Sequence, residues 1–226
     1  MLRKRDRADG RRRNPWLFWP GVGLVLAGLA ILAYVAWQFI GTNYVSQRHQ
    51  RQAREELQQA WVKGHRIART PWGNTDAIIR IPRFGSAYAV PVFEGTSQAV
   101  LAAGFGHFIG TAGPGQVGNY ALAAHRVTHG EPLRNMPQLQ PGDTVIVDTK
   151  ATTYTYRLTS GGSALVVPFT STWVTNPLPT NPTAGGIQPA QKQGQRLITL
   201  TTCSELFHTN NRMIAFGVLV SRAPRT

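Results

Sequence analysis

The sequence has little cysteine and little acidic charge. Cys203 is the only cysteine among 226 residues, so the chain cannot form an internal disulfide. A lone thiol is a small buried residue, an intermolecular link or a nucleophile. The chain has only 10 Asp and Glu beside six His, and they show no spacing typical of a metal site. We therefore expect neither a bound metal nor a cofactor.

Charge is absent from a long segment near the start of the chain. The 25 residues from Trp16 to Ile40 carry no charge, and as a helix they would reach roughly 37 Å, enough to cross a hydrocarbon core of about 30 Å. No Ala-x-Ala cleavage pattern follows them, which favours an uncleaved anchor over a signal peptide. The sequence therefore predicts a transmembrane helix over 16–40, in the cell membrane.

Basic residues dominate the segment before this span. Seven of them precede residue 14: Arg3, Lys4, Arg5, Arg7, Arg11, Arg12 and Arg13. The net charge of +14 would suit a polyanion such as nucleic acid, but a basic run beside an apolar span is typical of membrane topology. The positive-inside rule places residues 1–15 in the cytoplasm as a basic tail and the rest of the chain outside. We expect no nucleic-acid partner.

The remainder divides into a helical segment and a strand-rich domain. Residues 46–61 are rich in Gln, Arg, Glu and Ala, so 41–74 is predicted to be a helical stalk or linker. From 75 to 222, short apolar runs broken by Gly, Pro and Asn predict a mostly β domain, a sandwich or barrel with short helices such as 96–104. The proline-rich loop over 168–194 is predicted to line a substrate groove, because it leads into the strand that ends at Cys203.

Two strand-like runs surround the cysteine. "RLITLTTC" and "RMIAFGVLV" are joined by eight residues, a spacing that permits an antiparallel pair. Such pairing places Cys203 and Arg212 at the same end of the ladder. A guanidinium beside a thiol favours the thiolate and can also donate hydrogen bonds to an oxyanion.

Nucleophilic chemistry by a cysteine also needs a proton donor for the leaving group. His125 is the strongest candidate, because it ends the strand-like run "NYALAAH" and so lies at a strand terminus. His129, His107 and His208 are alternatives, in a turn, a glycine-flanked segment and the loop after the cysteine. For each of these histidines a structural role is the competing interpretation.

Three motifs together resemble a known family. They are "TLTTC" followed nine residues later by arginine, "NYALAAHRVTHGEP", and "GHFIGTAGPGQVGN". With the N-terminal anchor, the segment from Ala77 to Ser221 is similar to a sortase of the class E type. The resemblance implies an eight-stranded β-barrel, preceded by the transmembrane helix and the stalk. Ala124 stands where this family usually has glycine.

The resemblance also implies the roles of individual residues. Cys203 would be the nucleophile, His125 the general acid and then base, and Arg212 the residue that positions substrate and stabilises the oxyanion. Two further residues would lie close to the substrate. Thr202 would offer its backbone N–H to the oxyanion, and His107 would shape the barrel end.

The implied activity is acyl transfer. A sortase cleaves a Thr–Gly bond in a C-terminal sorting motif of the Leu-Ala-x-Thr-Gly or Leu-Pro-x-Thr-Gly kind and passes the acyl group, through a thioester, to an amine of the cell wall. The partners would be secreted proteins that bear the motif and a peptidoglycan precursor or stem-peptide amine. Two alternatives stay open: a membrane-anchored cysteine hydrolase that uses the same residues with water, and a noncatalytic wall-binding module with a buried Cys203.

Overall fold

A computed structural model describes residues 15–37, 41–204 and 210–225. The chain divides into two compact units, Met1–Gln38 and Phe39–Thr226. Three parts of the expected organisation lie outside the described residues. They are the basic tail up to position 14, the last three residues of the span, and the segment 205–209, which contains His208.

The first unit contains one helix, α1 (Pro15–Ala36), among its described residues. From Phe18 to Ala36 it is long and apolar enough to cross a membrane. Its large side chains are exposed, including Trp19 and Leu32. An apolar surface of this size is stable in lipid rather than in water.

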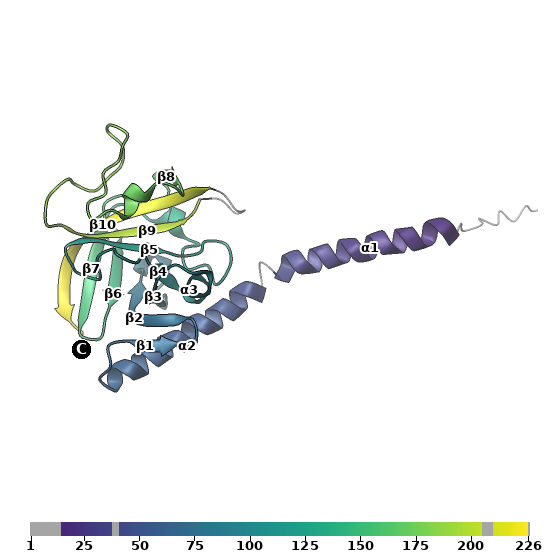
Figure 1. Cartoon of the computed structure of the whole chain (residues 1–226), viewed down its shortest axis with the longest axis horizontal. Coiled ribbons are helices and arrows are strands. Elements are labelled where there is room, and N and C mark those ends of the chain that lie inside the picture. The colour runs from purple at the N-terminus through teal and green to yellow at the C-terminus, as the bar shows by residue number, and fades with distance from the viewer. Residues whose placement is uncertain (1–14, 38–40, 205–209, 226) are drawn as a thin grey trace, which may run out of the picture. The chain divides into compact units, whose positions relative to one another are not determined.

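The second unit is built on a closed β-barrel (Figure 1). Its strands, in spatial order, are β2 (Gly73–Arg80), β3 (Val90–Glu94), β4 (Phe105–His107), β5 (Gly118–Ala123), β9 (Arg196–Cys203), β10 (Asn211–Pro224), β7 (Thr152–Leu158) and β6 (Thr144–Asp148). The pairing of β6 with β2 closes the ring, which confirms the eight-stranded barrel. Two more strands pair at its edges: β1 (Ala68–Thr70) with β2, and β8 (Leu165–Pro168) with β10.

Alternation of side chains along the strands produces the core. Ala77, Ile79 and Ile81 point into the barrel, whereas Ile78 points outward, as the period of two requires. The largest fully buried side chains inside include Tyr120, Tyr156, Phe105 and Leu122. Short 3₁₀ helices lie in the connections: η2 (Pro82–Phe84), η3 (Met136–Gln138) and η4 (Thr172–Thr175).

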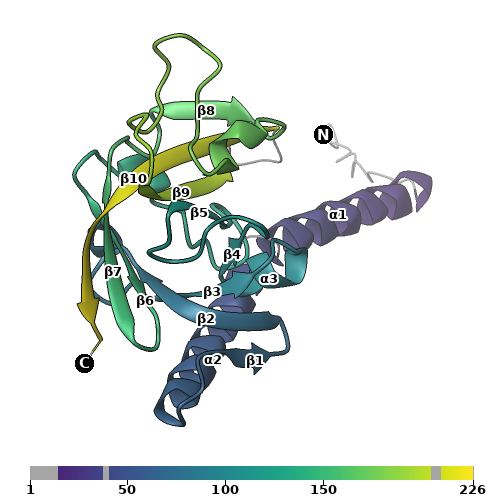
Figure 2. The same ribbon diagram turned by 60° about the vertical axis from the view of Figure 1, so that its left-hand side comes forward.

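A long helix, α2 (Thr42–Val62), covers the outside of the barrel. Ala53, Leu57 and Trp61 recur every fourth residue and are buried, so they form one apolar stripe. The stripe packs against β1, β2, β3 and the short helix α3 (Gln98–Ala103), as Figures 1 and 2 show. The segment expected to be a stalk thus forms a helix that lies against the barrel, followed by β1 and the start of β2.

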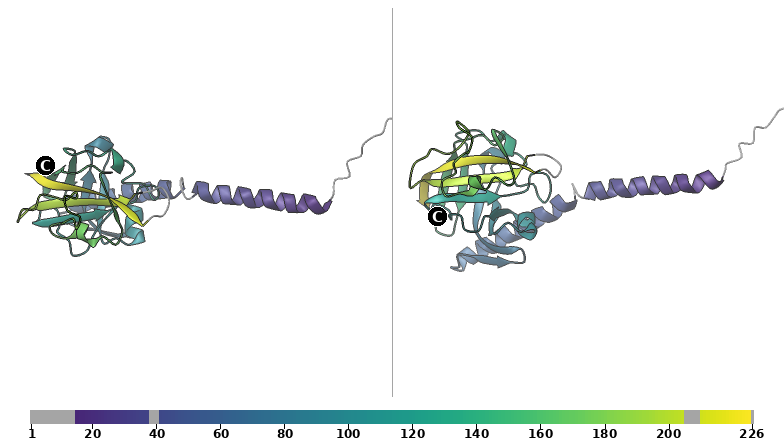
Figure 3. Two further views of the ribbon diagram at one scale, coloured as in Figure 1. Left: turned by 90° about the horizontal axis from the view of Figure 1, so that it is seen from above. Right: turned by 45° about the horizontal axis from the view of Figure 1, so that its top comes forward.

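The strand directions bring several strand ends to one rim of the barrel. β5 and β9 are parallel, so their C-terminal ends lie together. β10 is antiparallel to β9 and begins at this rim, where Figure 3 shows the two strands side by side. β4 is antiparallel to β5 and parallel to β3, so β3 also begins here. This rim, called the β5–β9 rim below, holds the strand ends at Ala123, Cys203, Asn211 and Val90.

Candidate active site

Cys203 and Arg212 are cross-strand neighbours on the β5–β9 rim. They are the first register pair of β9 and β10, which confirms the pairing expected from the two apolar runs. Cys203 is half-buried, and Arg212 donates from Nη1 to the carbonyl of Asn211 at 2.9 Å. Cys203 is thus a half-buried thiol at a strand end, directly opposite an arginine across the ladder.

His125 is brought to the same rim by the parallel pairing of β5 with β9. The residue before it, Ala124, is fixed twice: its N–H donates to the carbonyl of Thr201 at 3.2 Å, and its carbonyl accepts from Oγ1 of Thr202 at 2.7 Å. Ala124 is buried in the barrel core. Its methyl group, extra relative to the usual glycine, is therefore accommodated by packing.

The residue after His125 is also tied to β9. Arg126 donates from Nη2 to the carbonyl of Ser204 at 2.9 Å. The neighbours of His125 are thus bonded to residues on both sides of Cys203. Sequence reasoning missed Arg126, because its partner lies 78 positions away and nothing in the local pattern indicates it.

A groove of about 440 Å³ contains all three candidate catalytic side chains. Its lining comprises Thr96, Gln98, Leu101, Phe108, Ala123, Ala124, His125, Val167, Pro168, Phe169, Ser171, Thr172, Val174, Thr175, Thr201, Thr202, Cys203, Arg212 and Ile214. The lining combines apolar side chains such as Val167, Phe169 and Ile214 with hydroxyl-bearing and ionisable ones. This composition is typical of a site that binds an extended ligand and orients it with few polar contacts.

One wall of the groove comes from the start of the proline-rich loop. Residues from 168 to 175 line the groove, whereas the described lining includes none from 176 to 194; that second part runs away from the barrel (Figure 2). The wall is anchored by Asn119, which is fully buried. Its amide donates to the carbonyls of Val174 and Asn176 at 3.0 and 3.1 Å. The prediction that the whole loop lines the groove therefore holds only for its first part.

The chain from His125 to Leu133 forms a loop whose conformation is fixed by several contacts. Its closure is a hydrogen bond from the N–H of Leu133 to the carbonyl of His125 at 3.0 Å. His129 stacks on His125 with ring centroids 4.9 Å apart, and burial lowers the pKa of His129. His129 and Glu131 both have positive φ, 55° and 49°, a conformation that persists only where surrounding contacts fix it.

Those contacts come from the first turns of α2. Asn43 accepts from the N–H of Gly130 at 2.8 Å and donates to the carboxylate of Glu131. A Cβ added to Gly130 would meet the amide of Gln50 at 2.3 Å, so helix and loop are in close contact. The helix before the barrel therefore helps to hold the loop that begins at His125.

Of the two residues expected near the substrate, only Thr202 is among the groove lining. His107 lies on β4, and its Nδ1 pairs with Glu94 at 3.0 Å while its Nε2 lies 2.9 Å from Oγ1 of Thr111. It also packs on the ring of Tyr120. These contacts connect β4 to the neighbouring strands β3 and β5. Within residues 15–37, 41–204 and 210–225, no three His, Cys, Asp or Glu side chains gather as metal ligands.

The sequence and the fold of the chain were compared with those of known proteins. The pattern that defines the Sortase domain matches residues 79–220. The chain belongs to the sortase family. Sortase SrtE1 of Streptomyces coelicolor is 34% identical over 210 residues, which cover 89% of this chain and 56% of the relative. This sortase therefore spans little more than half the length of that relative.

Solved sortases share both the fold and the class. Sortase E from Streptomyces avermitilis is 35% identical with a TM-score of 0.58, over 69% of this chain and 93% of the other. Sortase E1 from Streptomyces coelicolor, solved with a tripeptide in its active site, is 33% identical with a TM-score of 0.57, over 70% and 94%. The present sortase is of the class E type.

Proposed function

We propose that this sortase is a membrane-anchored cysteine transpeptidase. It cleaves the Thr–Gly bond of a Leu-Ala-x-Thr-Gly or related C-terminal motif and transfers the acyl group to an amine of the cell wall. The observation that carries the proposal is the meeting of Cys203, His125 and Arg212 in one groove. Thiol, proton donor and fixed cation are the groups that acyl transfer through a thioester requires.

The first half-reaction begins with Cys203 as the thiolate and His125 protonated, and Sγ of Cys203 attacks the carbonyl carbon of the threonine. The carbonyl oxygen becomes an oxyanion, which accepts hydrogen bonds from Arg212 and from the backbone N–H of Thr202. The oxyanion then collapses, the C–N bond to glycine breaks, and the departing amine takes a proton from His125. A thioester and a neutral imidazole remain.

The second half-reaction runs the same steps with a new amine. The amine nitrogen attacks the thioester carbonyl, His125 takes its proton, and the C–S bond breaks to return the thiolate. The apolar groove walls exclude water from the thioester, which favours aminolysis over hydrolysis.

Product analysis distinguishes this reaction from hydrolysis and from simple wall binding. The full chain in detergent would be mixed with a Leu-Ala-x-Thr-Gly peptide and a small amine, and the products measured by mass spectrometry. We expect the cleaved peptide to carry the amine. A product with a free threonine carboxylate as its only form would indicate a hydrolase, and an intact peptide would indicate a binding module.

Arg212 offers a quantitative test of the oxyanion role. We expect Arg212→Ala to lower kcat/KM by about 10²- to 10³-fold, by analogy with the loss of other oxyanion donors. Arg212→Lys keeps the charge but loses the planar fork of donors, so it should restore only part of the rate. Full restoration by lysine would show that a point charge is sufficient and would contradict the proposed hydrogen-bonding geometry.

The anchor and its orientation form part of the proposal. α1 spans the membrane, the basic tail lies in the cytoplasm, and the barrel lies outside the cell. Protease added to intact protoplasts is expected to digest the barrel while sparing an epitope placed at the N-terminus. Protection of the barrel in intact cells would contradict this topology.

A further inference from the structure

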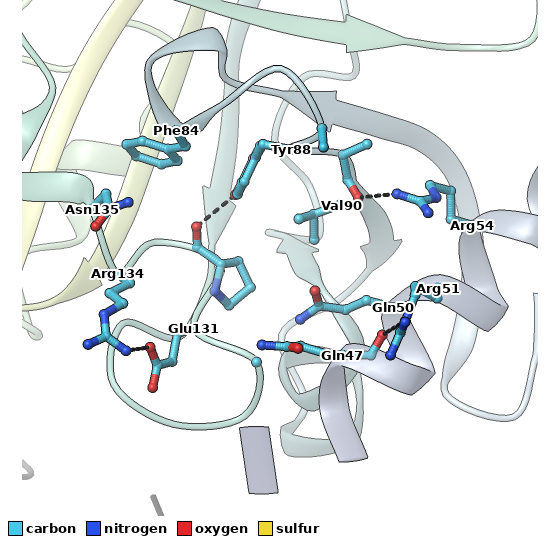
Figure 4. Close-up of a pocket in the computed structure, with 14 residues that line it drawn as sticks. Gln47, Gln50, Arg51, Arg54, Phe84, Tyr88, Val90, Glu131, Arg134 and Asn135 are labelled. Carbon is cyan, nitrogen blue, oxygen red and sulfur yellow. Dashed lines mark hydrogen bonds and ion pairs between the residues drawn. The ribbon is translucent and has the colours of Figure 1, made fainter. Parts of the chain in front are cut away.

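A second pocket lies on the β5–β9 rim, where the loop that begins at His125 approaches α2. It has a volume of about 530 Å³ and lies between α2, the start of β3 and the loop residues 130–135 (Figure 4). The same loop contributes His125 to the groove and five residues to this pocket, called the α2 pocket below: Gly130, Glu131, Pro132, Arg134 and Asn135. One loop therefore takes part in both cavities.

The α2 pocket is positively charged. Arg51 and Arg54 line it from the helix and Arg134 lines it from the loop, where Arg134 pairs with Glu131 (Figure 4). Glu131 is the one carboxylate in its lining, and its two oxygens already accept from Arg134 at 2.5 Å and from Asn43. Among the described residues, neither Arg51 nor Arg54 forms an ion pair.

The two helix arginines have donors to spare. Arg51 bonds the carbonyl of Gln47 at 3.3 Å, and Arg54 bonds the carbonyl of Ala89 at 3.2 Å. A guanidinium has five N–H donors, so most remain available to a ligand. Gln50 also lines the pocket, and in the described part of the chain its buried amide nitrogen has no hydrogen-bond partner. The pocket thus offers an excess of donors over acceptors.

The wall opposite the helix is fixed to the catalytic histidine. Leu133, between two lining residues, donates its N–H to the carbonyl of His125 at 3.0 Å, and Tyr88 holds the carbonyl of Pro132 at 2.7 Å. The loop that lines the α2 pocket is therefore held by the backbone of His125, the residue proposed to take the proton from the attacking amine. The reaction has two substrates, and the groove with Cys203 accounts for the acyl donor.

We propose that the α2 pocket binds the carboxylate of the amine that accepts the acyl group. This inference rests on the proposed transpeptidase function. Planar guanidinium groups match the geometry of carboxylates and bind them by charge-assisted hydrogen bonds. An amino-acid or peptide acceptor carries such a carboxylate. The distance from its amine to the carboxylate is set by its length, about 3.3–3.6 Å for each extended residue. The pocket selects acceptors whose length bridges it to the thioester.

Matched acceptors test this role. The full chain in detergent would be given a sorting-motif peptide and glycine peptides of increasing length, each as the free acid and as the C-terminal amide. The amine is the same within each pair, so the ratio of the two acceptor KM values reports the carboxylate alone. At the length that reaches the pocket, we expect the free acid to have a KM about tenfold lower, the effect typical of a charge-assisted hydrogen bond.

Arginine variants then locate the effect. Arg51→Gln and Arg54→Gln are expected to bring the KM ratio close to unity while the rate of peptide cleavage without amine stays at the wild-type level. Arg48→Gln is the matched control, because Arg48 is exposed on the same helix, stacks on Tyr44 at 4.3 Å, and lies outside the pocket lining. It removes the same charge and should leave the ratio unchanged.

The possible results test the acceptor site and the proposed transpeptidase function separately. Cleavage with no carboxylate preference at any acceptor length would overturn the α2 pocket as an acceptor site and leave the transpeptidase intact. An equal loss of preference in Arg48→Gln would assign the effect to overall charge and would also overturn the pocket. Absence of peptide cleavage in the wild type would overturn the proposed function, and the acceptor site with it.

Discussion

Cys203→Ala is expected to abolish both peptide cleavage and acyl transfer. Cys203 is the only thiol in the chain, so no other side chain can form the thioester. The residue is half-buried at the end of β9, and removing one sulfur there leaves the barrel core untouched. Thermal unfolding should therefore give a Tm close to that of the wild type, and a peptide cleavage assay should show no turnover above background.

The serine variant sharpens this test. Cys203→Ser keeps a nucleophilic atom in place, but a hydroxyl is a far weaker nucleophile than a thiolate without a dedicated base. We expect its activity to be close to that of the alanine variant. Residual acyl transfer in Cys203→Ala, measured with the sorting-motif peptide and an amine, would contradict the assignment of the nucleophile.

His125→Ala is expected to reduce the cleavage of the Thr–Gly bond by about 10²- to 10⁴-fold, the usual contribution of a general acid–base group. The departing amine cannot leave without a proton. A thioester analogue of the substrate does not have this requirement, because a thiol has a pKa of about 8.5 and leaves as the thiolate. The loss should therefore be large with the amide substrate and much smaller with the thioester substrate.

His129→Ala is the matched control for this variant. His129 stacks on His125, so its removal changes the surroundings of the catalytic ring without removing the ring. We expect a modest loss that is equal for the amide and thioester substrates. Equal losses for both substrates in His125→Ala would show that His125 does not protonate the leaving group.

The local part of the site could be predicted from the sequence. Two apolar runs on either side of a short connection indicate a hairpin, and the hairpin alone places Cys203 opposite Arg212. His125 is different, because β5 and β9 are parallel and the chain between them contains several other elements. No periodicity in the sequence predicts that pairing. The end of a strand-like run favours His125 among the histidines, and the family resemblance then implies its role.

The supporting contacts could not be predicted in this way. Asn119, Arg126 and Asn43 each bond to backbone atoms between 55 and 87 positions away, and a single polar residue gives no signal of a distant partner. α2 shows a second limit. Its thin apolar stripe is compatible with a solvated stalk, but Leu57 and Trp61 are buried against Ala68 and Ile78. The stripe is buried only because the folded barrel provides an apolar surface for it to pack against.

The most direct measurement of the central claim is the intact mass of the protein during turnover. The full chain would be mixed with a Leu-Ala-x-Thr-Gly peptide, quenched in acid without amine, and analysed by mass spectrometry with peptide mapping. The account predicts an adduct on Cys203 with the mass of the peptide fragment that ends at threonine, and addition of an amine before the quench should remove the adduct and yield peptide carrying that amine. Cleavage of the peptide with no adduct on Cys203, or an adduct that amines do not discharge, would contradict it.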